Sequence, residues 1–239
     1  MSLPTLVLVP GLMCDAAVWA PLLPSLSVHR QCVVVDHGDS DDLADMAQRL
    51  LADAPEQFAL AGHSMGGRVA LEVCRLAPQR VSHLALMDTG HAARAAGPAG
   101  EEEARKRQAL LDKARGQGLR AMAAEWVQGM VHPQRLTDQA LISAILDMFE
   151  RKTADIFERQ IRALLIRPDA SAVLERLTMP MLVQCGRQDS WANIAQHQAL
   201  QALAPHAALD IIEDAGHMAP MEQPEAVAAS LLRWLGRHA

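Results

Sequence analysis

A serine lies at the centre of the pentapeptide Gly62–Gly66 (GHSMG), which fits the pattern G-x-S-x-G. The pentapeptide follows a short apolar run, residues 58–61, and leads into a segment with apolar residues at helical spacing, residues 65–76. A glycine-flanked serine between a strand and a helix is typical of a nucleophile elbow, a tight turn that exposes the hydroxyl. The sequence therefore predicts that Ser64 is a nucleophile.

Two further residues could activate that hydroxyl. A serine attacks well only when a base takes its proton and an acid orients the base. His217 follows the apolar run at residues 209–212, and Asp189 follows the run at residues 181–185. Both would lie beyond the carboxyl ends of parallel strands, where open α/β sheets place their sites. We therefore predict a catalytic set of Ser64, Asp189 and His217.

Two alternatives remain open for these roles. Asp88 also ends an apolar run and could be the acid in place of Asp189. His91 follows the same run and could be the base in place of His217. Asp189 is favoured because its position, after a later strand, is the more usual one for the acid.

The chain alternates short apolar runs with longer helical patterns. Near-continuous hydrophobicity in a short run is typical of a strand covered on both faces, as in a parallel sheet. Segments such as residues 43–54 and 65–76 have the helical pattern. This rhythm predicts an α/β fold with a doubly wound, mostly parallel sheet of about six strands. The predicted strands are residues 5–9, 32–35, 58–61, 84–87, 181–185 and 209–212.

The rhythm breaks between residues 91 and 168. This segment is charged and helical, opens with the loop-like Gly97–Gly100 (GPAG) and ends at Pro168. We expect about four helices and no strand in it. The predicted organisation is a core of residues 1–90 and 169–239, with residues 91–168 inserted as a helical unit.

Together, the serine turn, the order of acid and histidine, and the inserted helices resemble the α/β-hydrolase fold family, over nearly the whole chain. The likeness is to its serine-nucleophile, esterase-like members with a helical cap. The turn Val9–Leu12 (VPGL) resembles the family's glycine turn, although Pro10 stands where histidine is common. The resemblance implies an oxyanion hole made by the backbone N–H groups of Leu12 and Met65, and a cap formed by residues 91–168.

The expected activity is cleavage of a small or medium, mostly apolar carboxylic ester through an acyl-enzyme. Apolar side chains from the insertion would face the cleft, because flexible methionines suit an adaptable apolar pocket. The residues expected to line this pocket are Trp126, Met130, Met148, Trp191 and Met218.

Other activities could use the same three residues. Similar proteins carry out perhydrolysis, as cofactor-free haloperoxidases do, thioester cleavage or carbon–carbon bond hydrolysis. A non-catalytic binding protein on this fold is less favoured, because the serine, acid and histidine are all present. Nucleotide binding is also disfavoured, because the glycines around Ser64 do not fit G-x-G-x-x-G.

Composition excludes several classes of function. The 239 residues include no tyrosine, so no phenol can act as acid, base or oxyanion donor. The net charge of −6 and the 3% aromatic content disfavour nucleic-acid binding. The four cysteines form no CxxC pair, and no cofactor or metal is expected. With no apolar run long enough to span a membrane, we expect a cytoplasmic protein that acts on a small-molecule ester.

Overall fold

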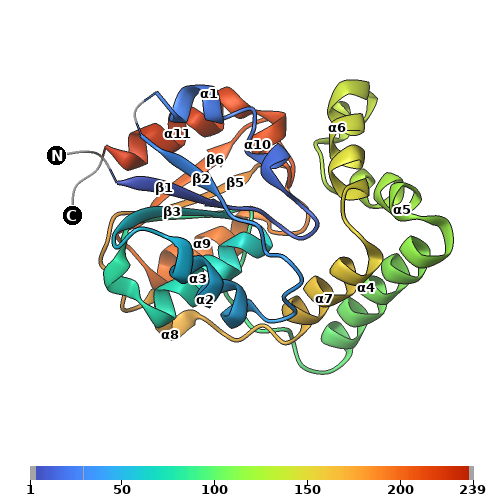
Figure 1. The fold of residues 1–239 in the computed structure, drawn as a ribbon, viewed down its shortest axis with the longest axis horizontal. Coiled ribbons are helices and arrows are strands. Elements are labelled where there is room, and N and C mark those ends of the chain that lie inside the picture. Colours follow the sequence, from blue (N-terminus) through green and yellow to red (C-terminus); the bar gives the residue numbers. More distant parts are fainter. Residues whose placement is uncertain (1–3, 29, 237–239) are drawn as a thin grey trace.

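A computed structural model describes residues 4–28 and 30–236 of the chain (Figure 1). Its centre is a six-stranded sheet in the order β2-β1-β3-β4-β5-β6, and every neighbouring pair of strands is parallel. The predicted fold class is therefore confirmed. The strands are β1 (Thr5–Val9), β2 (Cys32–Val34), β3 (Phe58–His63), β4 (Val81–Met87), β5 (Met181–Gly186) and β6 (Ala208–Ile212).

The middle strands are buried on both faces. Every residue of β3 and β5 is buried, which fits their near-continuous apolar sequences. Leu60 of β3 pairs with Val7 of β1 on one side and with Leu84 of β4 on the other. Because β3, β4 and β5 are neighbours in register, the loops that follow them meet at one edge of the sheet.

Helices cover both faces of the sheet, as Figure 1 shows. Helices α1 and α11 lie on one face, and α2, α3, α8 and α9 lie on the other. Short 3₁₀ turns η1 (Ala16–Val18) and η2 (Pro78–Arg80) precede α1 and β4. The α-helices outside the segment between β4 and α8 are α1 (Leu23–Leu26), α2 (Leu43–Asp53), α3 (Met65–Leu76), α8 (Ser171–Leu174), α9 (Ile194–Leu203), α10 (Ala219–Glu222) and α11 (Pro224–Leu235).

Between β4 and α8 the described chain is helical and contains no strand. The elements are α4 (Pro98–Gln117), α5 (Leu119–Trp126), η3 (Val127–Gly129), η4 (Pro133–Thr137), α6 (Gln139–Glu150) and α7 (Ala154–Leu165). Figure 1 shows α4 to α7 standing to one side of the sheet. Ion pairs join this helical segment to loops that follow the strands. Arg151 pairs with Asp15 at 2.7 Å, and Arg162 pairs with Asp41 at 2.9 Å.

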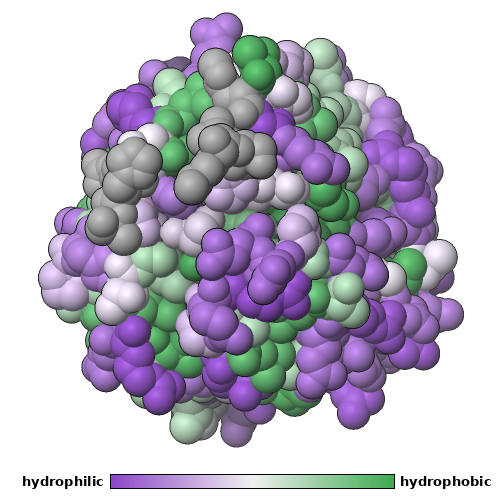
Figure 2. Space-filling view, turned by 60° about the vertical axis from the view of Figure 1, so that its left-hand side comes forward, coloured by the Kyte–Doolittle hydropathy of each residue, from purple (hydrophilic) through white to green (hydrophobic). Residues whose placement is uncertain are grey.

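The surface mixes polar and apolar side chains. On the face in Figure 2, hydrophobic residues lie among hydrophilic ones. In the described part of the chain, no helix is both long enough and apolar enough to cross a membrane.

Candidate active site

Ser64 sits at a strained turn between β3 and α3. Its φ of 55° is in the left-handed region, which a non-glycine residue rarely adopts. Two backbone contacts hold this conformation: the Ser64 N–H donates to the Met87 carbonyl at 2.8 Å, and the Thr89 hydroxyl donates to the Ser64 carbonyl at 2.7 Å. Strain that surrounding bonds maintain in this way is common at functional sites.

The glycines around Ser64 are required by close backbone approach. A Cβ added at Gly62 would lie 2.3 Å from the carbonyl oxygen of Gly66. A Cβ added at Gly66 would lie 2.1 Å from the carbonyl oxygen of Val9. Neither backbone oxygen can move away without shifting the strand or turn that carries it. The G-x-S-x-G pattern therefore reflects packing of the turn against β1 as well as exposure of the serine.

This packing gives a stability prediction. Gly66→Ala should lower the free energy of unfolding by about 1–3 kcal/mol or more, because the added methyl group overlaps the Val9 carbonyl. The matched control is Gly116→Ala in α4, where an added Cβ meets nothing within 4 Å. That variant should gain about 0.4–1 kcal/mol through the lower entropy of its unfolded chain. Urea denaturation of both variants measures the difference, and equal stabilities would contradict the packing argument.

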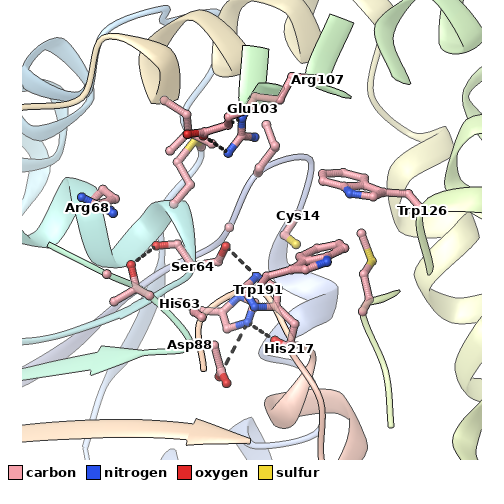
Figure 3. Close-up of a pocket in the computed structure, with 18 of the residues that line it drawn as sticks. Cys14, His63, Ser64, Arg68, Asp88, Glu103, Arg107, Trp126, Trp191 and His217 are labelled. Carbon is pink, nitrogen blue, oxygen red and sulfur yellow. Dashed lines mark hydrogen bonds and ion pairs between the residues drawn. The ribbon is translucent and has the colours of Figure 1, made fainter. Parts of the chain in front are cut away.

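The structure brings the predicted serine, histidine and acid together, and Figure 3 shows Ser64 and His217 of this set. Nε2 of His217 lies 2.8 Å from Oγ of Ser64, and Nδ1 of His217 lies 2.8 Å from Oδ2 of Asp189. The other carboxylate oxygen of Asp189 accepts bonds from the amides of Trp191 and Ala192, both at 2.9 Å. Burial alone would raise the pKa of Asp189, but the charge and hydrogen bond of His217 and the two amides lower it. This carboxyl is therefore ionised and fixed against the imidazole.

The alternative acid lies next to this set but does not contact the imidazole. Oδ1 of Asp88 accepts the amide of Gly186 at 2.9 Å, and Oδ2 lies 3.8 Å from Nε2 of His63 but accepts no hydrogen bond within the described residues. Burial and the nearby Asp189 raise the pKa of Asp88 well above its usual range, which favours the protonated form of this carboxyl. The alternative base, His91, is not one of the residues that line the cavity above Ser64.

His63, beside the serine in sequence, packs under the site. Its Nε2 is 2.7 Å from the carbonyl oxygen of His217. Burial and the nearby His217 lower the pKa of His63 to about 3, so its ring is neutral and can donate to that carbonyl. His63 therefore supports the loop that carries His217 and does not face Ser64 as a base.

The two residues predicted to supply the oxyanion amides, Leu12 and Met65, line the same cavity as Ser64. Met65 is the first residue of α3, and the first N–H of a helix has no acceptor within that helix. Leu12 lies in the turn after β1, and neither amide donates to another group within the described residues. The next residue, Met13, has a φ of 62°, and its N–H donates at 2.8 Å to Oε1 of the buried Gln160 of α7. The inserted helices thus hold the turn that carries Leu12, a contact that sequence patterns do not reveal.

A cavity of about 500 Å³ opens above Ser64. Four of the five expected lining residues do line it: Trp126, Met130, Trp191 and Met218. The rings of Trp126 and Trp191 stack with centroids 5.5 Å apart, and Trp191 lies 5.0 Å from the imidazole of His217. These residues form an apolar, aromatic side of the cavity.

Met148 does not line the cavity, contrary to expectation. It is fully buried in α6, while the next residue, Phe149, does face the cavity. Successive residues of a helix point about 100° apart, so the orientation of α6 that brings Phe149 to the cavity points Met148 away from it.

The other side of the cavity is charged, which the expectation of a mostly apolar pocket did not include. The charged residues that line it are Arg68, Glu102, Glu103, Lys106, Arg107 and Arg167. The one available sequence signal was Arg68, which follows Ser64 by four residues and lies in the first turn of the helix predicted over residues 65–76. Among the described residues, no three His, Cys, Asp or Glu side chains are arranged to hold a metal ion.

Residues 6–230 match the model of the alpha/beta hydrolase family. The chain belongs to this family. This α/β hydrolase is 32% identical to the dihydrolipoyllysine-residue acetyltransferase component of the acetoin cleaving system of Pseudomonas putida; the match covers 98% of this chain and 64% of that protein, so the chain spans less than two thirds of its length. It is 26% identical to the pimeloyl-[acyl-carrier protein] methyl ester esterase of Aliivibrio salmonicida, over 96% of this chain and 91% of that one.

Among solved structures, a thermophilic esterase from Thermogutta terrifontis superposes with a TM-score of 0.84. It is 24% identical and the match covers 97% of this chain and 89% of that one, which shows a shared fold. The family match, and not this structural likeness, places the chain among the hydrolases.

Proposed function

We propose that this α/β hydrolase cleaves small or medium, mostly apolar carboxylic esters through an acyl-enzyme formed on Ser64. The observation that carries the proposal is the pair of 2.8 Å contacts from His217, one to Ser64 and one to Asp189. A hydroxyl, an imidazole and a buried carboxylate in this arrangement are the parts that nucleophilic acyl transfer needs. The ester-cleaving relative from Aliivibrio salmonicida supports the same bond type.

In the first half of the reaction, Oγ of Ser64 attacks the ester carbonyl carbon and its proton passes to Nε2 of His217. The carbonyl electron pair moves to oxygen, where the amides of Leu12 and Met65 would stabilise the charge. The tetrahedral intermediate then collapses, the alcohol leaves with the proton from His217, and the acyl group stays on Ser64. Asp189 keeps the imidazole oriented and stabilises its charged form.

In the second half, water replaces the alcohol. His217 takes a proton from the water, whose oxygen attacks the acyl carbon. Collapse of the second intermediate returns the proton to Ser64 and releases the carboxylic acid. We further propose that residues 91–168 act as a cap, because Trp126 and Phe149 of this segment line the cavity above Ser64.

A series of p-nitrophenyl esters with acyl chains of about two to twelve carbons tests this proposal. We expect turnover of the short and medium members, with kcat/KM falling once the acyl chain exceeds the 500 Å³ cavity. Parallel assays with hydrogen peroxide, a thioester and a β-diketone test the alternative uses of the same residues. Absence of ester turnover throughout the series would overturn the proposal.

A further inference from the structure

The charged side of the cavity carries more positive than negative groups. Its lining includes four cationic side chains, Arg68, Lys106, Arg107 and Arg167, and two carboxylates, Glu102 and Glu103. A cavity that holds an excess of cations in a partly dry setting favours an anionic ligand, because field lines concentrate between low-dielectric walls.

Both carboxylates are already engaged by other cations. Glu103 bonds Arg107 at 2.9 Å and accepts two bonds of 2.8 Å from Arg167. Burial alone would raise the pKa of Glu103, but the hydrogen bonds from Arg167 and the nearby Arg107 lower it to about 2. Glu102 pairs with Arg105 and, at 3.5 Å, with Lys106. The ion pairs of both carboxylates are therefore with other cations and not with Arg68.

Arg68 has no carboxylate partner within 4 Å in the described part of the chain. Its one hydrogen bond there runs from Nη1 to the carbonyl of Ala92 at 2.7 Å. Gly90 lines the cavity beside it, and a Cβ there would lie 3.0 Å from Nη2, so the absence of a side chain keeps this end of the guanidinium accessible. Burial and the charges of Arg167 and Arg107 lower the pKa of Arg68 to about 9, although the charges of Glu103 and Asp169 oppose this shift; a bound anion would raise the pKa again.

Arg68 and Ser64 line the same cavity, so one ligand can reach both. Ser64 is the residue before α3, and Arg68 lies in the first turn of that helix. Figure 3 shows Arg68 on the opposite side of Ser64 from Trp126, so the charged and aromatic sides flank the serine. A guanidinium binds a carboxylate through two parallel hydrogen bonds, a geometry that fixes the ligand's orientation.

We propose that Arg68 binds a carboxylate carried by the ester substrate a few bonds from its carbonyl group. This inference rests on the proposed ester hydrolysis and narrows its substrate class to short esters that also bear an acid group. The carboxylate can belong to the acyl part, as in a monoester of a dicarboxylic acid, or to the alcohol part.

Matched ester pairs test the inference and distinguish these two sources. Monomethyl glutarate against methyl hexanoate tests a carboxylate on the acyl part, and 4-acetoxybutanoate against pentyl acetate tests one on the alcohol part. The wild-type enzyme should prefer the acid member of one pair. In Arg68→Gln the ratio of kcat/KM for acid and neutral members should fall by about 10–100-fold, the usual effect of losing a charge-assisted hydrogen bond. Arg68→Lys should keep part of the preference.

The control variant is Arg115→Gln, which removes a cation from α4 outside the cavity, where Arg115 pairs with Glu158 at 2.6 Å. It should leave the ratio unchanged. A turnover-independent readout is the melting temperature: glutarate should raise it more than neutral glutaramide does, and Arg68→Gln should remove that difference.

Two results would overturn the inference: equal kcat/KM for both members of each pair, or glutarate and glutaramide with the same effect on melting. These failures can occur while neutral esters are still hydrolysed through Ser64, in which case the proposed function stands. Failure of the enzyme to hydrolyse any ester would overturn the proposed function, and the melting comparison would still test carboxylate binding.

Discussion

Ser64→Ala should lower kcat for ester hydrolysis by roughly 10⁴–10⁶-fold. The substitution removes only Oγ, the atom 2.8 Å from Nε2 of His217, and with it the nucleophile. The backbone bonds that hold residue 64, to Met87 and Thr89, do not involve this atom and should persist. The variant should therefore fold and melt as the wild type does while losing turnover.

The measurement is kcat on the best p-nitrophenyl ester, with circular dichroism as a check on folding. Ser143→Ala is a matched control, because this serine lies on α6 and is not one of the cavity-lining residues. It should retain wild-type kcat. A Ser64→Ala enzyme that kept activity within about tenfold of wild type would show that another group attacks the ester.

The two aspartates near His217 should respond very differently to the same substitution. Asp189→Asn should lower kcat by about 10⁴-fold, because an amide cannot stabilise the charged imidazole and favours the wrong tautomer. Asp88→Asn should keep kcat within about threefold of wild type. Because the raised pKa of Asp88 favours its protonated form, asparagine imitates that neutral form and can still accept the Gly186 amide.

Comparing kcat for the two variants decides which aspartate is the acid. The opposite ranking, with Asp88→Asn the more damaged enzyme, would assign the role to Asp88.

The dependence of the free energy of unfolding on pH gives a second, independent test of the raised pKa of Asp88. Its folded-state pKa is raised, so below about pH 4 the residue is protonated in both the folded and the unfolded chain and contributes nothing to the difference. As pH rises from there towards the raised folded-state pKa, more of the unfolded than of the folded chain is ionised, and stability falls. Asp88→Asn should remove this cost, so urea denaturation should show the variant gaining stability over wild type at pH 7.5 and not near pH 4.

The sheet and the serine turn could be predicted from sequence because their signals are local. Apolar runs such as residues 58–61 mark buried strands, and the following glycine-flanked serine needs only its own neighbours to form a turn. Asp189 and His217 could be predicted as the acid and the base because each follows such an apolar run. The choice between Asp189 and Asp88 could not be made in the same way, because both follow neighbouring strands. Only the side-chain geometry distinguishes them.

The charged side of the cavity could not be predicted because it depends on how α4 packs against α7. Glu103 and Arg107 have the sequence pattern of a solvated helix face, yet they are partly buried against Arg167 from a segment about 60 residues away. The prediction that Met148 lines the cavity was wrong for a related reason, since the periodicity of apolar residues does not say which side of α6 faces the cavity. Contacts between distant helices, and not local propensity, set these details.

The most direct test of the account is covalent labelling with a fluorophosphonate, which reacts only with an activated serine. Peptide mass spectrometry should find one adduct, on Ser64, in the wild-type enzyme. The adduct should be absent in Ser64→Ala and form much more slowly in Asp189→Asn. An enzyme that hydrolyses esters yet carries no adduct on Ser64, or carries it on another residue, would contradict the account.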